Sequence, residues 1–359
     1  MAESAEQPLA SLEFLYCGHG DTILVGSDAC WGLVDCHLTK SSGAHARIRD
    51  WIEERGIRRL DFVCLTHPDR DHCFGMRKLL EECFCDNDGV RFSEFWDAGI
   101  PSPLMLTLDM KLHRGRPTIT RGIRGLYEEL LVPLARQDRF AWRSCQQGFE
   151  AYFGQFRLRA IGPKRNAVER WKDRLLDGRE PWGRAHREES NDLSVVLVLS
   201  HRQLPVHFLL GGDATTRAWM AALEYWRTES WEEADTRFSG VKISHHGALS
   251  GHYPPLYELF CRREKTVGVL SVGPDYELRP DAQVMRDLTR FEIPVFATCW
   301  PQSSERGLDG LPLPGEPLDD HPFPREGSGF GWNDVRVTIC CDGQVVAKPP
   351  EALLRLSGP

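Results

Sequence analysis

The segment Thr-His-Pro-Asp-Arg-Asp-His at 66–72 constrains the fold more than any other part of this sequence. It follows the run Phe-Val-Cys-Leu at 62–65, a short apolar stretch typical of a buried strand. Two imidazoles and two carboxylates, all common metal ligands, therefore share one loop after a strand. A loop can turn all four toward one point, which a helix face cannot do at this spacing. The alternative is a solvated polar turn with aspartate–arginine pairs at the surface.

Two further apolar runs also end in ligand-type residues, which argues against a simple polar turn. The run 207–210 leads to Gly-Gly-Asp213, and the run 241–243 leads to Ser-His245-His246-Gly. Glycines let the backbone approach a metal closely, although Asp213 could also cap the helix expected after it. Adjacent histidines on an extended chain point to opposite sides, so we expect at most one direct ligand from this pair. The other would orient a ligand or protonate a leaving group.

Strand-like and helix-like segments alternate along most of the chain. Strands are expected within 11–36, at 62–65, 193–199, 207–210, 241–243, 267–272 and 295–298, and as a hairpin over 335–347. Helices are expected over 45–57, 76–83, 127–136, 217–226 and 282–290. Polar clusters stand where strands end, and this pattern suits two sheets packed face to face with helices outside. Residues 86–190 are the least readable, and 300–333, rich in proline and glycine, predict a surface loop.

Composition limits the partners and the compartment. The net charge of -8 and pI of about 5.9 predict no whole-molecule attraction to nucleic acid, so such binding needs a local basic patch. The first ten residues lack the features of a signal peptide, and no apolar run is long enough to span a membrane. The twelve cysteines contain no C-x-x-C pair, and several lie in apolar runs. We therefore expect a reduced, cytoplasmic protein without membrane association.

The order of these motifs resembles the metallo-β-lactamase superfamily. The motifs are GHGD, VDC, THPDRDH, NDLSVVLVL, LLGGDA, SHHG and LSVG. They are most similar to the ComEC-like branch, known from the nuclease domain of the DNA-uptake channel of competent bacteria. The resemblance runs from about residue 12 to 346 and is interrupted around 86–155 and 300–333. It implies a single α/β (α+β) domain over 1–359: an αββα sandwich of two mixed β-sheets with helices outside and a family-variable insert within 86–190.

The resemblance also implies a site for two divalent metal ions. Its metal ligands would be His67 and Asp69 for one ion, Asp71 and His72 for the other, Asp213 as a bridge, and His246 to complete the shell. Asp71, His245 and His246 would be catalytic. Asp69 stands where many members have histidine, and the oxygen-rich set favours Mn²⁺ or another hard ion, with Zn²⁺ still open.

Departures from the branch concern the substrate side of the site. Asn191 lies before its strand as in the branch, where a third histidine often occurs in the wider superfamily, so one ion would be weakly held. The segment Gly-Pro-Asp-Tyr-Glu-Leu-Arg-Pro replaces an Asn and a Gly-His-Pro motif, and it places Arg279 where it could clamp a phosphate. An ordinary surface arginine is the alternative. Asn191, Arg279 and Ser244 are the candidate substrate-binding residues.

The function implied is metal-dependent hydrolysis of a phosphodiester, with DNA as substrate, in DNA defence or processing. Two ions roughly 3.5–4 Å apart can share a hydroxide that attacks phosphorus. Arginine-rich stretches at 114–124 and 157–187 could contact nucleic acid, or could be a solvated charged insert. Two alternatives remain: a hydrolase of a small phosphodiester or lactone, and a metal-bearing effector or binding module that acts with partner proteins. Activity of the isolated chain on nucleic acid would count against the binding module.

Overall fold

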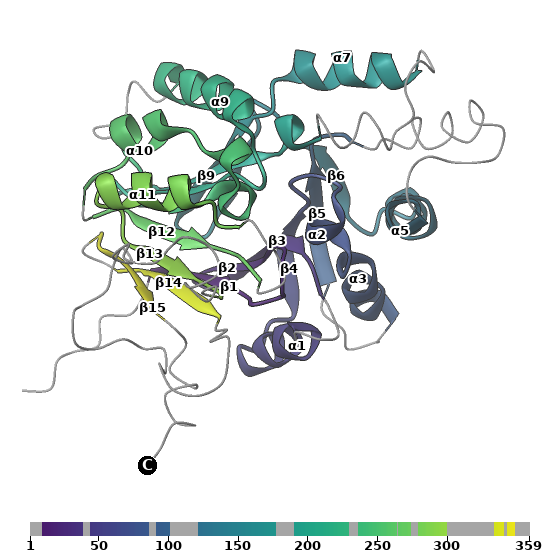
Figure 1. Ribbon diagram of the computed structural model, residues 1–359. Coiled ribbons are helices and arrows are strands. Elements are labelled where there is room, and N and C mark those ends of the chain that lie inside the picture. Colours follow the sequence, from purple (N-terminus) through teal and green to yellow (C-terminus); the bar gives the residue numbers. More distant parts are fainter. Residues whose placement is uncertain are drawn as a thin grey trace, which may run out of the picture.

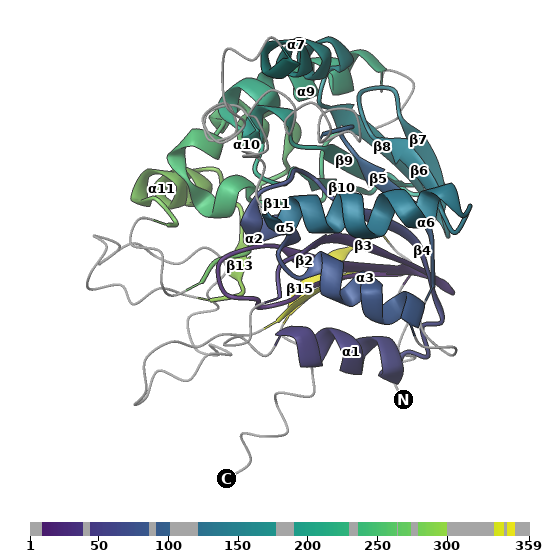
Figure 2. The same cartoon turned by 90° about the vertical axis from the view of Figure 1, so that its right-hand side faces the viewer.

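Two β-sheets packed face to face form the centre of the molecule (Figure 1). The computed structural model describes residues 9–38, 44–85, 91–100, 121–176, 190–229, 236–263, 265–273, 279–299, 334–340 and 343–348. Helices lie against the outer faces of the two sheets within these ranges (Figure 2). The expected two mixed sheets with helices outside are therefore confirmed.

The first sheet has eight strands in the order β15-β14-β1-β2-β3-β4-β5-β6. Its strands are β1 (Ala10–Phe14), β2 (Thr22–Ser27), β3 (Cys30–Cys36), β4 (Arg59–Cys64), β5 (Arg91–Asp97), β6 (Ala141–Ser144), β14 (Val335–Ile339) and β15 (Val345–Lys348). Neighbours from β3 to β6 are parallel, and the other pairs are antiparallel. β1, β3 and β4 therefore run in the same direction, and the loops that follow them leave the sheet at one edge.

The second sheet has seven strands in the order β13-β12-β11-β10-β9-β8-β7. Its strands are β7 (Glu150–Phe153), β8 (Phe156–Gly162), β9 (Val196–His201), β10 (His207–Leu210), β11 (Gly240–Lys242), β12 (Val267–Leu270) and β13 (Val295–Ala297). β10 to β13 are parallel, so the loops after β10, β11 and β12 also meet at one edge.

Helices cover both outer faces. They are α1 (Ala44–Glu54), α2 (Arg70–Cys73), α3 (Met76–Cys85), α5 (Arg121–Arg124), a π-helix (Gly125–Leu131), α6 (Val132–Arg136), α7 (Arg165–Leu176), α9 (Thr216–Glu229), α10 (Pro254–Phe260) and α11 (Ala282–Arg290). Figure 1 shows α1 and α3 on the side of the first sheet, and α9, α10 and α11 on the side of the second. Short 3-10 turns at Asn191–Leu193 and Ser244–Gly247 complete the described helical segments that matter for the site.

Aromatic side chains join the layers. The rings of Phe14 and Phe208 lie 6.2 Å apart between the two sheets, and those of Phe62 and Phe153 lie 5.3 Å apart. On the far side of the second sheet, α9 buries Trp219 and Trp226 in a separate apolar cluster. Burying a large apolar side chain contributes roughly 1.5–3 kcal/mol, so both layers are firmly attached and the loops at their common edge have a rigid base.

Some details differ from the sequence predictions. β5, β6 and α7 were not predicted, because charged residues interrupt the apolar pattern in 86–190. The strands β5 to β8 are members of the two sheets, and the family-variable insert within 86–190 stays a prediction. The surface loop predicted over 300–333 lies outside the described residues. Among the described helices none has the length and apolar character that crossing a membrane requires.

Candidate metal centre

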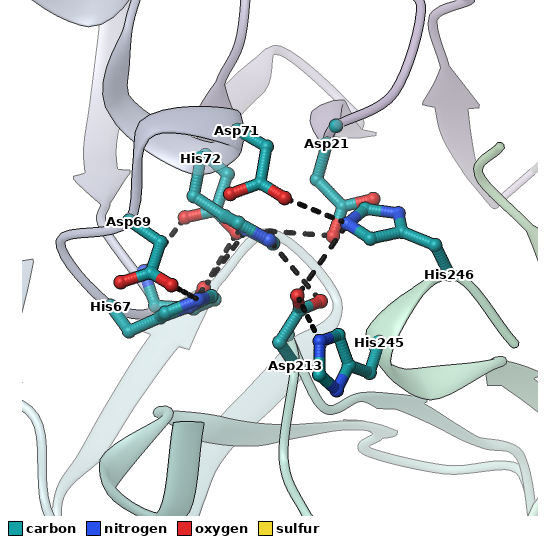
Figure 3. A network of polar contacts seen from close by, with 12 residues as sticks. Asp21, His67, Asp69, Asp71, His72, Asp213, His245 and His246 are labelled. Atoms are coloured by element: carbon teal, nitrogen blue, oxygen red, sulfur yellow. Dashed lines mark hydrogen bonds and ion pairs between the residues drawn. The ribbon is translucent and has the colours of Figure 1, made fainter. Parts of the chain in front are cut away.

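Loops from both sheets converge on one cluster of buried polar side chains (Figure 3). Asp21 follows β1, His72 follows β4, Asp213 follows β10 and His246 follows β11. Ligand-type atoms of these four residues all lie within 4.8 Å of one another, and all four side chains are buried. The convergence follows from topology, because parallel strands bring their carboxyl ends to the same edge.

Backbone hydrogen bonds hold these loops together. The N–H of Val195 in the second sheet donates to the carbonyl oxygen of Thr66 at 2.9 Å, and the N–H of Asp21 donates to the carbonyl oxygen of Asp71 at 3.0 Å. Gly212 has a φ of +51° and passes so close to Thr66 that a Cβ atom would lie 2.7 Å from the threonine hydroxyl. Only glycine allows that approach, so Asp213 reaches the centre because of the glycine before it.

Distances within the cluster centre on Asp213. One carboxylate oxygen of Asp213 lies 3.2 Å from Nε2 of His72, and the other lies 3.5 Å from Nε2 of His246. Asp71 joins from the first sheet, with an oxygen 3.6 Å from the same His246 nitrogen. A second group of ligand-type atoms combines Asp71 and His246 with His19. Asp213 is therefore placed between side chains of both sheets, as a bridging ligand would be.

Three imidazoles share one arrangement. The Nδ1 atom of His72 lies 2.7 Å from an oxygen of Asp35, that of His246 lies 2.7 Å from the carbonyl oxygen of Ser271, and that of His67 lies 3.1 Å from the hydroxyl of Thr66. Each Nδ1–H donates to its acceptor, so in the neutral imidazole the lone pair is on Nε2 and is available to a metal ion. These three Nε2 atoms are buried and have no hydrogen-bond partner.

This arrangement fits a divalent metal ion. A metal-bound histidine almost always donates its other ring N–H to a carboxylate or carbonyl, which fixes the tautomer and directs the free lone pair at the ion. Oxygen Oδ1 of Asp213 is also buried without a hydrogen-bond partner. Buried polar atoms without partners are costly, and an ion bound by imidazole and carboxylate would satisfy them together. The donor set of nitrogen and oxygen suits Zn²⁺, Mn²⁺ or iron.

Electrostatics also favour positive charge at the centre. Burial acts to lower the pKa of His72, but the carboxylates of Asp213 and Asp35 outweigh it and hold the pKa well above its ordinary value. Burial acts to raise the pKa of Asp213, but His246, His72 and Lys242 hold it well below its ordinary value. The carboxylates of Asp213 and Asp35 thus stabilise positive charge beside them, as they would on a bound cation.

A buried lysine supplies one positive charge within the protein itself. Lys242 and Asp21 form an ion pair with both side chains fully buried, and the Lys242 ammonium also donates to the carbonyl oxygen of Gly212 at 2.8 Å. The same ammonium lies 3.6 Å from Asp213. Asp21 therefore holds Lys242 beside the carboxylate of Asp213. Neither residue was predicted as part of the site, although Asp21 belongs to the GHGD motif and a lysine inside a buried strand requires a charged partner.

His245 faces a different set of neighbours. Its Nε2 atom accepts from Arg279 at 2.9 Å and from the Asn191 amide at 3.3 Å, and its Nδ1 lies 3.0 Å from the Ser250 hydroxyl. Arginine only donates, so the proton of neutral His245 is on Nδ1. Burial lowers the pKa of His245 to about 4. The predicted proton donation from His245 would therefore require Arg279 and Asn191 to move away from Nε2.

The predicted residues divide into four groups. His72, Asp213, His246 and Asp71 are together at the centre. His67 packs against His72 with ring centroids 4.1 Å apart, and Asp69 lies 3.8 Å from Nε2 of His67, so this pair adjoins the centre and its metal role stays a prediction. Asn191 and Arg279 are half-buried and donate to Nε2 of His245, at the side of the centre. Ser244 is buried and donates to the carbonyl oxygen of Ala214 at 2.7 Å, so it supports the loop of Asp213.

Two structural expectations about these segments were wrong: residues 70–72 of the predicted loop belong to the short helix α2, and the histidine pair is not extended. His245 and His246 do not lie on an extended chain: their φ values are 51° and 52°, and both Nε2 atoms face Asp213 within 3.7 Å. Two successive residues in the left-handed conformation turn both imidazole rings to the same side. On an extended strand, successive side chains would point to opposite sides. The alternative role of Asp213, as the cap of α9, is filled by a neighbouring residue. The Thr215 hydroxyl takes that role by accepting from the N–H of Ala218.

Comparison with known proteins supports the fold. Residues 15–101 match the model of the metallo-beta-lactamase superfamily. That range contains β2 to β5 and the loop 66–72. No curated protein sequence matches this chain. Residues 15–101 thus carry the sequence pattern of the superfamily, and the two mixed sheets with outer helices are its fold.

Solved structures with a similar fold share little sequence with this chain. The metallo-beta-lactamase fold protein YhfI from Bacillus subtilis is 11% identical, with 81% of this chain and 96% of that chain covered and a TM-score of 0.44. Unliganded yeast PDE1 is 10% identical, with 81% and 98% covered and a TM-score of 0.46. A diphosphatase from the PhnP family is 10% identical, with 80% and 94% covered and a TM-score of 0.40. These likenesses say nothing about the activity of this chain, and the ComEC-like branch stays a prediction.

Proposed function

We propose that this chain, which has the metallo-β-lactamase fold, is a metal-dependent hydrolase that cleaves phosphodiester bonds in DNA. One observation carries the metal dependence: His67, His72 and His246 each have a bonded Nδ1 and a buried Nε2 without a hydrogen-bond partner. His72, His246 and Asp213 would hold an ion, with Asp71 beside them. Bound divalent ions would lower the pKa of a water molecule and neutralise charge that develops on a phosphate.

Donors at the side of the centre support an anionic substrate. The two terminal nitrogens of Arg279 point at neutral imidazoles, one at His245 and one 3.2 Å from Nε2 of His19. A phosphate oxygen is a stronger acceptor than a neutral imidazole, and a guanidinium can bind two such oxygens at once. The Asn191 amide adds a neutral donor on the same side. These groups would orient a phosphodiester at the side of the cluster.

The test uses purified protein with Mn²⁺ or Zn²⁺ and four substrates: linear DNA, circular DNA, RNA and bis-p-nitrophenyl phosphate. We expect cleavage of DNA and of the small diester. The variants Asp71→Asn and His72→Gln should each lower the rate more than about 100-fold, because even an outer-shell change costs roughly 10- to 100-fold. The matched control is His45→Gln on α1, where His45 pairs with Glu82 at 3.1 Å and contacts none of the cluster.

Each other outcome would overturn a stated part of the proposal. Hydrolysis of the small diester without any cleavage of DNA would replace the nuclease with an enzyme for small phosphodiesters. If all four substrates survive with every ion, or if Asp71→Asn and His72→Gln cleave as fast as His45→Gln does, catalysis at this centre is refuted. Circular dichroism of each variant checks that it is folded.

A further inference from the structure

A cavity of about 500 Å³ lies between α7 and α9, away from the cluster of metal-ligand side chains. Both helices lie at the top of the molecule in both views (Figures 1 and 2). Its volume falls within the range of pockets that bind small ligands, roughly 300–1,000 Å³. The wall contains several alanines, among them Ala218, Ala221 and Ala222 of α9, whose short side chains leave this space open.

The lining of this cavity is positively charged, although the whole chain is negative. Lys164, Arg170 and Arg174 come from the start of α7 and from the helix itself, and Arg217 comes from the start of α9. Asp173 and Asp192 are the acidic residues of the lining. Asp192 already accepts a hydrogen bond from the Thr215 hydroxyl and lies 3.6 Å from Arg217. Lys164 lies 3.7 Å from Glu224, so the arginines supply most of the positive charge of the lining, beside an apolar floor.

The segment 190–195 separates the cavity from the metal centre and contacts both. Asp192 and Leu193 line the cavity, while the neighbouring Asn191 donates to His245. Ser190 donates to Asp69 at 3.2 Å, and Val195 donates to Thr66 in the loop that carries His67 and His72. Neighbouring residues of this one segment thus contact the cationic cavity and the site of the proposed cleavage.

We propose that this cavity is a subsite for the nucleotide next to the scissile phosphodiester of a polynucleotide. This inference rests on the proposed function. The phosphate of that nucleotide would lie against Arg170, Arg174 and Arg217, and its sugar and base would lie over the alanine floor. A nucleotide combines an anionic group with an apolar ring face, and the cavity offers a complement to each. A small diester has no such neighbour and would not use the cavity.

The experiment compares Arg170→Gln/Arg174→Gln with Arg58→Gln/Arg59→Gln. Arg170 and Arg174 are exposed on α7, so their removal should leave the fold intact. Arg58 and Arg59 are also exposed but stand at the start of β4. The metal loop follows the far end of β4, about 20 Å away at roughly 3.3 Å per residue. This pair therefore removes the same charge at a distant place.

Two measurements distinguish a role of these arginines in the subsite from a role in the catalytic centre. Fluorescence anisotropy with a labelled single-stranded 20-nucleotide DNA, without added metal, measures binding. Loss of two cationic contacts should lower the slope of log K against log salt by about 1.4 for this single strand and weaken binding roughly tenfold at low salt. With metal, kcat/KM on DNA should fall roughly tenfold while kcat/KM on bis-p-nitrophenyl phosphate stays unchanged. The control variant should match wild type in every measurement.

The outcomes for the subsite and for the proposed function can be told apart. If the Arg170/Arg174 variant binds DNA with the wild-type affinity and salt slope, the subsite is refuted even if wild type cleaves DNA. Equal losses on DNA and on the small diester would also refute it, because they would place the arginines in the catalytic centre. If wild type cleaves none of the substrates, the proposed function fails, and the anisotropy result still decides whether the cavity binds nucleic acid.

Discussion

Lys242 offers the sharpest test of how the centre is built. Its ammonium is fully buried between Asp21, Asp213 and the carbonyl oxygen of Gly212. Lys242→Met would leave the carboxylate of Asp21 buried without its counter-charge. Removing one partner of a buried pair costs about 3–5 kcal/mol, whereas removing both is often nearly neutral. We therefore expect Lys242→Met to lower the unfolding free energy by about 3–5 kcal/mol, a change of roughly 150- to 5,000-fold in the folded-to-unfolded ratio.

The double variant Asp21→Asn/Lys242→Met should recover at least about 2 kcal/mol of that loss, because no unpaired charge remains in it. Urea unfolding followed by tryptophan fluorescence in the presence of a chelator measures both variants without help from a metal ion. The control Lys78→Met removes a largely exposed lysine of α3 and should change stability by less than about 0.5 kcal/mol. A loss below about 1 kcal/mol for Lys242→Met, or a double variant equal to the sum of the singles, would refute the reasoning.

Three further predictions concern pH, backbone and metal. Burial raises the pKa of Asp97 to about 6, so the folded chain holds this proton more tightly than the unfolded chain does. Relative to Asp97→Asn, wild type should therefore lose about 2.4 kcal/mol of stability between pH 4 and pH 7, and a difference independent of pH in urea titrations would contradict this. Gly20→Ala would place a Cβ 2.4 Å from the carbonyl oxygen of Asp71 and should cost about 2–4 kcal/mol in the same assay. Gly56→Ala, also at a positive φ but in open space, should cost only about 1 kcal/mol, and equal losses would be inconsistent with crowding at Gly20. Mn²⁺ or Zn²⁺ at 100 times its Kd should add about 2.7 kcal/mol to wild type and none to Asp213→Asn, as thermal melts with and without chelator would show; the same gain in both would place the ion elsewhere.

Local sequence patterns were enough to locate the segments that carry the candidate metal ligands. The loop 66–72 and the residues Asp213 and His246 each follow an apolar run, and a strand that ends in ligand-type residues is visible in the sequence itself. The two mixed sheets followed from the alternation of strands and helices together with the family resemblance. Because topology brings the carboxyl ends of parallel strands to one edge, the predicted ligands His72, Asp213 and His246 met as expected.

The remaining features depend on contacts between distant strands. The Asp21–Lys242 pair joins a turn after β1 to a residue inside β11, and neither position carries a local pattern that names the other. The left-handed turns at His245 and His246 depend on packing around the SHHG segment, so the extended geometry assumed for them was wrong. α7 was missed because charged residues dominate it, although Val168 and Trp171, both buried, have the three-residue spacing of a helix face.

An ion bound at this centre would link the two β-sheets, which are formed by different parts of the chain. Asp71 and His72 are contributed by the first sheet, and Asp213 and His246 by the second. A fragment that contains only one sheet would offer half of the ligands. Its affinity for the ion would fall by far more than a factor of two, because affinity depends exponentially on the binding free energy. Metal affinity is thus a direct measure of whether the two layers have docked, and a substitution anywhere in their shared apolar interface should weaken it without touching a ligand.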